Sequence, residues 1–419
     1  MHLVAVVAGL MTATAACRDD PPPPAGTGTG TTGTSTTGTT GTTGTTGTAS
    51  TGVSSGVLPD LAGYTTTGVD DGCGDGVPGQ ALCFAPRKLL DGGVVVGGLA
   101  TGDLDGDGLA DGLVAAEGGF YVAWADGDGS LTFTQAAAAS AATAVAPLRD
   151  GTGRVAVAFE SPPGVRLHVS DASRNVNGTV NVSLARAAVA LAVADVTDDG
   201  FADLLVAEAG TDADLLLVPG MAGGAFDVPS VIHTGAVYGG LTVGRLGIDP
   251  VVDVVFTDRA TNRWFARLGS EGGSTSTNSY ALAGDPRVPS LLDVTSDGFA
   301  DVAIPTTQNA RVTLFPVGAA GTVAAPSATD APSGAQAAVA GDFNGDGAAE
   351  LAVGGSQSGL VYVFRADPNA KRLVFDKVAV QISTGVAALA AGDLTGDGVD
   401  DLLVAEAGLG GLWFVPADP

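Results

Sequence analysis

The chain contains the stretch Gly102-Asp103-Leu104-Asp105-Gly106-Asp107-Gly108-Leu109-Ala110-Asp111, and the apolar run Leu113-Val114-Ala115-Ala116 follows it. Counted from Asp103, carboxylates occupy positions 1, 3, 5 and 9, and glycine at position 6 permits a sharp turn. Carboxylates this close repel one another unless a cation lies among them. A hard cation with six to eight oxygen ligands is typically calcium. The stretch therefore predicts a calcium-binding loop in front of a buried strand.

The same loop recurs, so that the chain carries five copies in register. In each copy positions 1, 3, 5 and 9 carry a side-chain oxygen and position 6 is glycine. A single Asp-Gly cluster is usually a turn, whereas five copies indicate about five calcium ions. The predicted ligands are Asp103, Asp105, Asp107, Asp111, Asp195, Thr197, Asp199, Asp203, Asp293, Thr295, Asp297, Asp301, Asp342, Asn344, Asp346, Glu350, Asp393, Thr395, Asp397 and Asp401.

The net charge of the 419-residue chain is −27. Acidity of this size argues against nucleic acid or an anionic membrane surface as a partner. Sixteen of the 45 Asp and Glu residues lie at the predicted ligand positions, so much of the charge belongs to the loops. The 45% hydrophobic content is ample for a large core.

The N-terminus predicts export. Residues 1–16 have an apolar stretch that is too short to span a bilayer and is typical of a signal peptide. Thr14-Ala15-Ala16-Cys17 resembles a bacterial lipobox, which would make Cys17 a lipidated first residue and anchor the protein in the cell envelope. Any membrane contact would then be through this lipid. Ordinary signal cleavage with secretion, or a misassigned start codon, is the alternative.

Residues 17–56 form a low-complexity Pro/Thr/Gly segment with almost no apolar side chains. Nothing in this segment repays the entropy of ordering, so it predicts a disordered tether, with or without glycans. Residues 57–83 form a short cysteine-containing segment. Cys73 and Cys83 make an even pair once Cys17 is set aside, and they predict a disulfide in an oxidising compartment.

The spacing of the loops predicts the architecture. Successive copies of position 1 lie 92, 98, 49 and 51 residues apart, so each long gap should contain one degenerate copy. Residues 145–159 and 241–256 supply those copies, which gives seven units of 45–51 residues. Both degenerate copies contain an arginine, Arg154 or Arg245, and we expect its guanidinium to replace the ion there.

Each unit contains four short apolar runs that are separated by turn residues, which indicates strands without helices. Four strands per repeat are typical of propeller blades, so residues 84–419 predict an all-β, seven-bladed β-propeller. The last unit stops one strand short, and residues 81–90 should supply that strand and close the ring. Trp124, Trp264 and Trp413 fall on third strands and are expected to pack between blades, with sugar stacking as the alternative.

The loop consensus followed by an apolar strand resembles FG-GAP/VCBS repeats, as in the β-propeller of integrin α subunits. The resemblance extends over residues 84–419 and is weakest in the two degenerate units. It implies a seven-bladed propeller, calcium in the hairpin between the first and second strands, and a ligand surface on the opposite face. The Phe-Gly and Gly-Ala-Pro pieces of the integrin repeat are not evident, so integrin partners cannot be carried over.

The sequence shows no catalytic motif. His168 and His233 lie in different units, and we expect them to be solvated or packed strand residues. Acids also fall at the ends of the predicted second strands, on the face away from the loops. These acids are Glu117, Glu208, Asp258 and Glu406, and they predict either a rim for a cationic or hydroxyl-rich ligand or a ring of solvated turns.

The sequence therefore predicts a calcium-stabilised, non-catalytic binding or adhesion propeller of a bacterial envelope lipoprotein. Its partner would be an unidentified surface protein or glycan. Two alternatives stay open. One is a secreted propeller enzyme that acts on polysaccharide or phosphoester, and the other is a purely architectural envelope protein.

Overall fold

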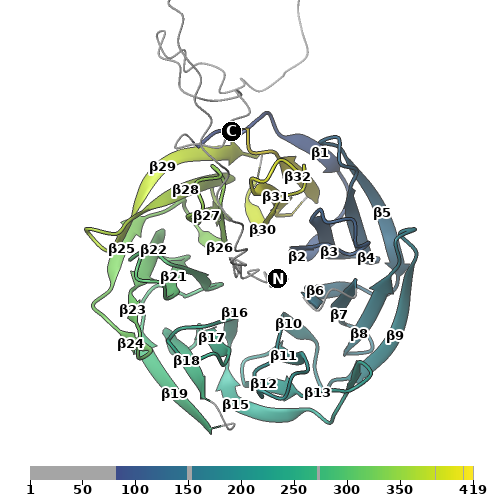
Figure 1. Ribbon diagram of the computed structural model, residues 1–419, viewed down its shortest axis with the longest axis horizontal. Coiled ribbons are helices and arrows are strands. Elements are labelled where there is room, and N and C mark those ends of the chain that lie inside the picture. Colours follow the sequence, from purple (N-terminus) through teal and green to yellow (C-terminus); the bar gives the residue numbers. More distant parts are fainter. Residues whose placement is uncertain (1–81, 149–152, 271–273, 383, 409, 419) are drawn as a thin grey trace, which may run out of the picture. The chain divides into compact units, whose positions relative to one another are not determined.

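The computed structural model describes residues 82–418 apart from 149–152, 271–273, 383 and 409. Seven four-stranded antiparallel sheets form a ring in this part of the chain (Figure 1). The prediction of an all-β, seven-bladed propeller is confirmed. The predicted signal peptide, Cys17, the low-complexity linker and Cys73 lie outside the described residues. The described part of the chain has no helix with the length and apolarity needed to cross a bilayer.

Each blade runs from an inner first strand to an outer fourth strand. The first three blades are β2 (Val96–Gly102), β3 (Asp111–Ala116), β4 (Gly119–Ala125) and β5 (Leu131–Ala138); β6 (Ala142–Leu148), β7 (Arg154–Phe159), β8 (Gly164–Ser170) and β9 (Val176–Ser183); and β10 (Ala188–Ala194), β11 (Asp203–Glu208), β12 (Ala213–Val218) and β15 (Ser230–Ala236). In the third blade a small ribbon of β13 (Gly220–Met221) and β14 (Ala225–Phe226) extends the hairpin.

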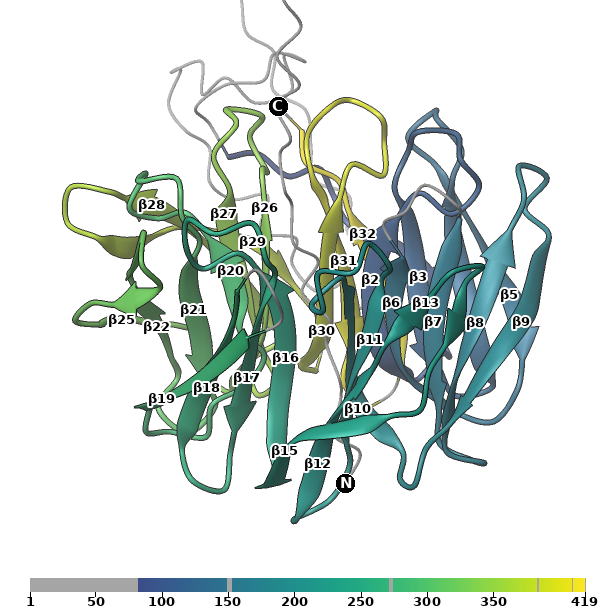
Figure 2. The same cartoon turned by 60° about the horizontal axis from the view of Figure 1, so that its bottom comes forward.

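The next three blades are β16 (Tyr238–Gly244), β17 (Asp253–Asp258), β18 (Arg263–Ser270) and β19 (Ser274–Ala281); β20 (Ser290–Leu292), β21 (Asp301–Thr306), β22 (Arg311–Phe315) and β25 (Ser327–Asp330); and β26 (Ala335–Gly341), β27 (Glu350–Gly355), β28 (Leu360–Asp367) and β29 (Arg372–Gln381). The fifth blade also carries the ribbon of β23 (Val317–Gly318) and β24 (Thr322–Val323). The turned view of Figure 2 shows β16, β17 and β18 side by side.

The seventh blade joins the two ends of the described chain. It consists of β30 (Val386–Gly392), β31 (Asp401–Glu406), β32 (Gly411–Val415) and, as its outermost strand, β1 (Lys88–Asp91). The pairing continues beyond β1, because Phe84 bridges Ala417 and the backbone N–H of Asp418 donates to the carbonyl of Cys83 at 3.0 Å. β1 thus covers the outer edge of β32 and gives the last blade the same four strands as the others. Cys83 is buried and disulfide-bonded.

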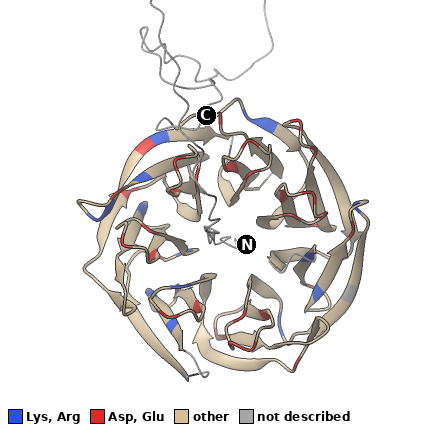
Figure 3. Cartoon of the chain, in the orientation of Figure 1, with Lys and Arg blue, Asp and Glu red and all other residues tan. Residues whose placement is uncertain are grey.

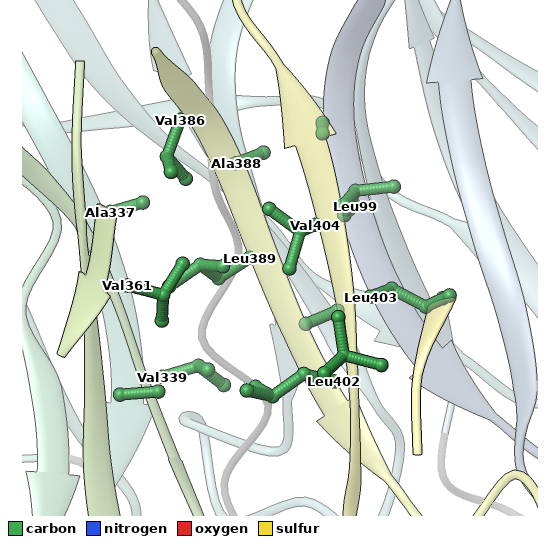
Figure 4. Packing of buried hydrophobic residues seen from close by; sticks show 14 of the residues in the cluster. Leu99, Ala337, Val339, Val361, Val386, Ala388, Leu389, Leu402, Leu403 and Val404 are labelled. Carbon is green, nitrogen blue, oxygen red and sulfur yellow. The ribbon is translucent and has the colours of Figure 1, made fainter. Parts of the chain in front are cut away.

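Small residues let the blades approach closely near the axis. Every residue of β30, whose sequence is VAALAAG, is buried. At Gly97 of β2 an added Cβ would lie 2.6 Å from the carbonyl oxygen of Ala142 in the next blade, so a side chain there would push the blades apart. Figure 4 shows the apolar packing on both sides of the seventh blade: Leu389 of β30 lies near Val361 of the sixth blade, and Leu403 of β31 faces the first blade, where its Cδ1 lies 2.5 Å from the place of a Cβ added at Gly112.

The three tryptophans lie on third strands, as expected, but their surroundings differ. Trp264 is completely buried, with its ring centroid 4.4 Å from that of Tyr280 and 5.0 Å from that of Phe315 in the next blade. Trp124 is also buried, whereas Trp413 is half-buried below the guanidinium of Arg87. Trp264 therefore packs between two blades, in agreement with the predicted role.

We expect Trp264→Ala to lower the free energy of unfolding by about 3–5 kcal/mol, because it opens a cavity between two blades. Chemical denaturation followed by circular dichroism measures this loss. Leu89→Ala is the matched control, since its side chain is 52% exposed and should change stability by less than about 0.5 kcal/mol. A similar loss in both variants would contradict the assigned packing role.

Candidate metal centres on the loop face

The acidic loops join first strands to second strands, so all of them lie at one end of the ring, here called the loop face. Acidic residues, red in Figure 3, mark these loops around the propeller. We number the loops by blade: loop 1 (103–111), loop 3 (195–203), loop 5 (293–301), loop 6 (342–350) and loop 7 (393–401). The topology thus brings each predicted ligand set to an equivalent place in its own blade.

The carboxylate at position 1 organises the backbone of its loop. In loop 7, the Asp393 carboxylate accepts the backbone N–H of Gly396 at 2.6 Å and that of Gly398 at 3.0 Å. Gly398, at position 6, has a φ of 86°, a conformation that residues with a side chain rarely adopt. The equivalent carboxylates are Asp103, Asp195, Asp293 and Asp342, and each accepts the N–H of its own position-6 glycine.

The carboxylate at position 9 is buried and ties the loop to the third strand. The two oxygens of Asp401 accept the N–H groups of Leu394 in the loop and Ala417 after β32, both at 2.9 Å. Burial raises the pKa of Asp401 to about 7, although these hydrogen bonds oppose the shift. Burial likewise raises the pKa of Asp111 to about 7, of Asp301 to about 6 and of Glu350 to about 8. A negative charge at position 9 is therefore costly unless a cation lies nearby.

The oxygen at position 3 lacks a partner in three loops. The hydroxyl oxygens of Thr197, Thr295 and Thr395 are shielded from solvent and make no hydrogen bond of normal geometry. Those of Thr197 and Thr395 lie close enough to the position-9 carboxylate to lower its pKa slightly against the effect of burial. A buried hydroxyl without a partner is uncommon, and an oxygen-seeking cation would satisfy it.

Loop 1 brings its acids closest together. Oxygens of Asp103, Asp105 and Asp111 all lie within 4.8 Å of one another, and within the described residues this is the one such group of three. Repulsion from Asp105 and Asp107 adds to burial in raising the pKa of Asp111. Closely spaced carboxylates together with unpartnered hydroxyls fit a hard cation bound by oxygen. The choice of calcium and the number of ions stay predictions.

The degenerate loop of the fourth blade lacks the predicted ligand set, so it shows which contacts remain without those residues. Asp253, at position 9, still accepts the N–H groups of Leu246 at 2.8 Å and Gly269 at 2.9 Å. Arg245, at position 1, donates from Nε to the carbonyl oxygen of Asp249 at 3.2 Å, so its guanidinium contacts the loop, and its replacement of an ion stays a prediction. In this loop the acid at position 9 thus keeps its hydrogen bonds to the backbone although positions 1 and 3 carry no acid. The corresponding loop of the second blade lies partly outside the described residues.

A cavity of about 460 Å³ lies among the inner ends of the blades on this face. Its lining includes Thr101, Asp103, Asp393 and Asp400. Two of these acids belong to the predicted ligand sets, so the cavity is continuous with the candidate metal loops.

The loop spacing gave no indication of Arg174, which comes from the hairpin between β8 and β9 in the second blade. Its Nε lies 2.8 Å from Oδ2 of Asp105 in loop 1, and its Nη1 lies 2.6 Å from Oδ1 of Asp126. No sequence signal identifies this residue, because the two partners in the first pair are 69 positions apart.

The four acids predicted as a ligand rim divide into two groups. Glu117 is exposed, but Glu208, Asp258 and Glu406 are buried. Each buried carboxylate accepts a backbone N–H from the segment that leads into its own blade; the donors are Arg186, Val237 and Thr384. These three acids hold the connections between blades and do not form an exposed rim.

The two histidines are packed within different blades. His168 is buried between Phe120 and Phe159, and burial lowers its pKa to about 4. His233 packs on Phe256 and Phe265. Both are packed strand residues, one of the two outcomes expected from the sequence, and they do not come together as a pair.

Comparison with known proteins fits this geometry. Residues 342–404 match the FG-GAP-like repeat family. The matched segment contains loops 6 and 7, two of the three loops in which the expected motif is most complete. No curated protein matches the chain.

The solved structures that resemble this chain include two crystals of BBS1N in complex with ARL6DN, one soaked with lead and one with mercury. Their TM-scores are 0.55 and 0.54, with 18% and 17% sequence identity. In both cases the match covers 80% of this chain and 96% of that chain. At this level of identity the likeness shows the fold alone.

We expect Asp253→Ala to lower the free energy of unfolding by about 2–4 kcal/mol, because two backbone N–H groups lose their acceptor. The loss should be equal in calcium and in EDTA, since this loop lacks the ligand set. Denaturation in each medium measures it, with the exposed Asp330→Ala as control. A loss confined to calcium would contradict a purely structural role.

We also expect the stability difference between wild type and Asp253→Ala to depend on pH. Burial raises the pKa of Asp253, so the folded state binds its proton more tightly than the unfolded state does. The contribution of this group is complete below the unfolded pKa and declines as pH rises through the folded pKa. The stability difference between wild type and Asp253→Ala should therefore shrink as the pH rises above about 4, the ordinary pKa of an aspartate.

Proposed function

We propose that this protein is a calcium-stabilised, non-catalytic binding or adhesion propeller at the surface of a bacterial cell. The propeller fold and the FG-GAP-like repeat match support a binding role. The observation that carries the calcium proposal is the set of shielded, unpartnered hydroxyls at position 3 of loops 3, 5 and 7, beside a buried carboxylate at position 9. Thr295 and Asp301 are one such pair.

The role proposed for calcium is structural. Positions 1, 3, 5 and 9 of the five loops would hold the ions, which supply the positive charge that buried carboxylates require. Loops 6 and 7 are also joined directly, since the N–H of Asp400 donates to the carbonyl of Asp342 at 2.8 Å. Extracellular calcium modules typically have dissociation constants of about 10⁻⁴–10⁻³ M, which suits a site outside the cell.

The proposed ligand surface is the face opposite the loops. Exposed amides such as Gln308, Asn309 and Gln357 lie in its hairpin turns. Arg259 and Arg287 share the carboxylate of Asp285 nearby, at 2.6 and 2.7 Å. Amides and paired charges suit hydroxyl-rich glycans or a polar protein surface. BBS1N, a chain of similar fold, was crystallised in complex with ARL6DN, which supports the use of this fold to bind another protein.

The proposed location follows from the N-terminal sequence. A lipid on Cys17 would anchor the chain in the envelope, and the Pro/Thr/Gly segment would hold the propeller away from the membrane. Secretion without the lipid leaves the binding role unchanged.

Thr295→Val tests the calcium proposal, because its effect on stability should have opposite signs in EDTA and in calcium. In EDTA the variant should be as stable as wild type or more stable, by up to about 1 kcal/mol, because an unpartnered buried hydroxyl is removed. In calcium it should lose part of the ion-dependent rise in melting temperature, because one ligand is missing. Calorimetric titration should show one weakened site.

Thr143→Val is the matched control, since the hydroxyl of Thr143 in β6 is also shielded and unpartnered but lies outside the loops. It should behave alike in both media. Identical calcium titrations for wild type and Thr295→Val would count against ligation by loop 5.

The binding role is tested with the full chain on glycan and protein arrays. We expect calcium-dependent retention of a ligand that disappears in EDTA, with no product formed. Gln308→Arg, on the proposed ligand face, should abolish retention through steric and charge mismatch. Val228→Arg, at a 77% exposed position near the loop face, should preserve it. Turnover of an array compound would refute the non-catalytic assignment.

A further inference from the structure

Arg174 places a positive charge inside loop 1 from the neighbouring blade. Besides its contacts with Asp105 and Asp126, its Nη2 donates to the carbonyl oxygen of Ala125 at 2.5 Å and lies 3.9 Å from Oδ2 of Asp107. The guanidinium therefore touches the acids at positions 3 and 5 of loop 1. Asp105 is almost fully buried, with a side-chain exposure of 4%, so this ion pair is only weakly screened by solvent.

The local structure holds Arg174 in this position. Its backbone has a φ of 61°, which is uncommon for a residue with a side chain. The Asp171 carboxylate accepts the N–H groups of Ser173 and Asn175, at 2.8 and 3.1 Å, and so fixes the turn. The guanidinium also lies 5.4 Å from the ring centroid of Trp124. The arginine is thus held by contacts to two blades.

The charges of the five loops explain why loop 1 differs. Loop 1 has carboxylates at all four ligand positions, whereas each other loop has three. The neutral residues at position 3 of those loops are Thr197, Thr295, Asn344 and Thr395. Within the described residues, no ligand-position carboxylate of loops 3, 5, 6 or 7 forms an ion pair. With Arg174 counted, the summed charge at the four ligand positions of loop 1 equals that of each other loop, although loops 3 and 7 carry one further acid outside those positions, Asp198 and Asp400.

We propose that Arg174 is the resident counter-charge of loop 1, which sets the affinity of this metal site and holds the loop together when no ion is bound. The inference rests on the proposed binding of calcium. One acid is added at position 3, and one arginine from the second blade offsets it. Arg174 lowers the calcium affinity of loop 1 because its positive charge repels the ion. A like unit charge about 6 Å from a divalent ion weakens binding about tenfold even at the dielectric constant of water.

Trp124 gives a readout that is specific to loop 1. Terbium occupies calcium sites and luminesces when a nearby excited tryptophan transfers energy to it. Trp124 is one residue before Ala125, whose N–H binds Asp111 of loop 1 at 3.0 Å. The other two tryptophans lie toward the opposite face, where the second strands end. The indole N–H of Trp413 donates to Glu406 at the end of β31, and Trp264 is the cross-strand partner of Thr257 near the end of β17. Displacement of terbium by calcium then measures the affinity of loop 1.

The experiment compares the full-length wild type with Arg174→Gln, Asp105→Asn and the double variant. Arg174→Gln should bind calcium at loop 1 about tenfold more tightly, and Asp105→Asn about tenfold more weakly. The double variant should return to within about threefold of wild type. In EDTA, Arg174→Gln should melt below wild type because Asp105 loses its partner. Arg311→Gln, at an exposed pair far from the loops, and Trp124→Phe, which removes the signal, are the controls.

Unchanged or weaker affinity in Arg174→Gln would overturn the inference while leaving calcium binding intact. Should Arg174→Gln not fold, Asp105→Asn and the double variant decide the question. The double variant should then bind calcium about tenfold more tightly than Asp105→Asn does. Equal affinities there would likewise overturn it. Absence of both terbium and calcium binding in wild type would instead refute the proposed function, and this inference with it.

Discussion

The structure depends most on a buried carboxylate at the start of the second strand, which six blades have and only the second blade lacks, since β7 begins at Arg154. In four of the five acidic loops this group accepts one or two backbone N–H groups from the loop and one from the end of the third strand, as Asp111 does with Leu104 and Ala125. An apolar residue could fill the space but would leave two buried donors without acceptors. The same group carries a charge that burial opposes. The buried carboxylate therefore has two roles: it fixes the loop by hydrogen bonds, and it favours a cation nearby.

In several blades the second strand has a buried acid at its other end as well. β11 begins at Asp203 and ends at Glu208, and β31 begins at Asp401 and ends at Glu406. The first acid fixes the loop that enters the strand, and the second fixes the connection from the preceding blade. Such strands are thus anchored at both ends by hydrogen bonds to backbone N–H groups. A part of the acidity of the chain thus serves to anchor second strands.

The sequence predicts the fold because the spacing of the loops and the apolar runs between them show the repeat directly. Seven blades follow from the spacing of Asp103 and its equivalents alone. The sequence could not show that Glu208 and Glu406 turn inward, since an acid at a strand end looks the same whether it meets water or a backbone N–H. It also gave no indication of Arg174, because its partner Asp105 lies in another blade and the contact exists only once the ring has formed.

The distribution of complete loops around the ring has a mechanical consequence. Loops 6, 7 and 1 are adjacent and joined, because Asp400 donates to the carbonyl of Asp342 and Ala110 donates to that of Asp393. These loops flank the seventh blade, where β1 and β32 come from opposite ends of the propeller. A ring is weakest where it is closed by hydrogen bonds instead of a continuous chain. Ions bound to three linked loops would therefore strengthen the propeller at its joint, and Arg174 extends that linkage to the second blade.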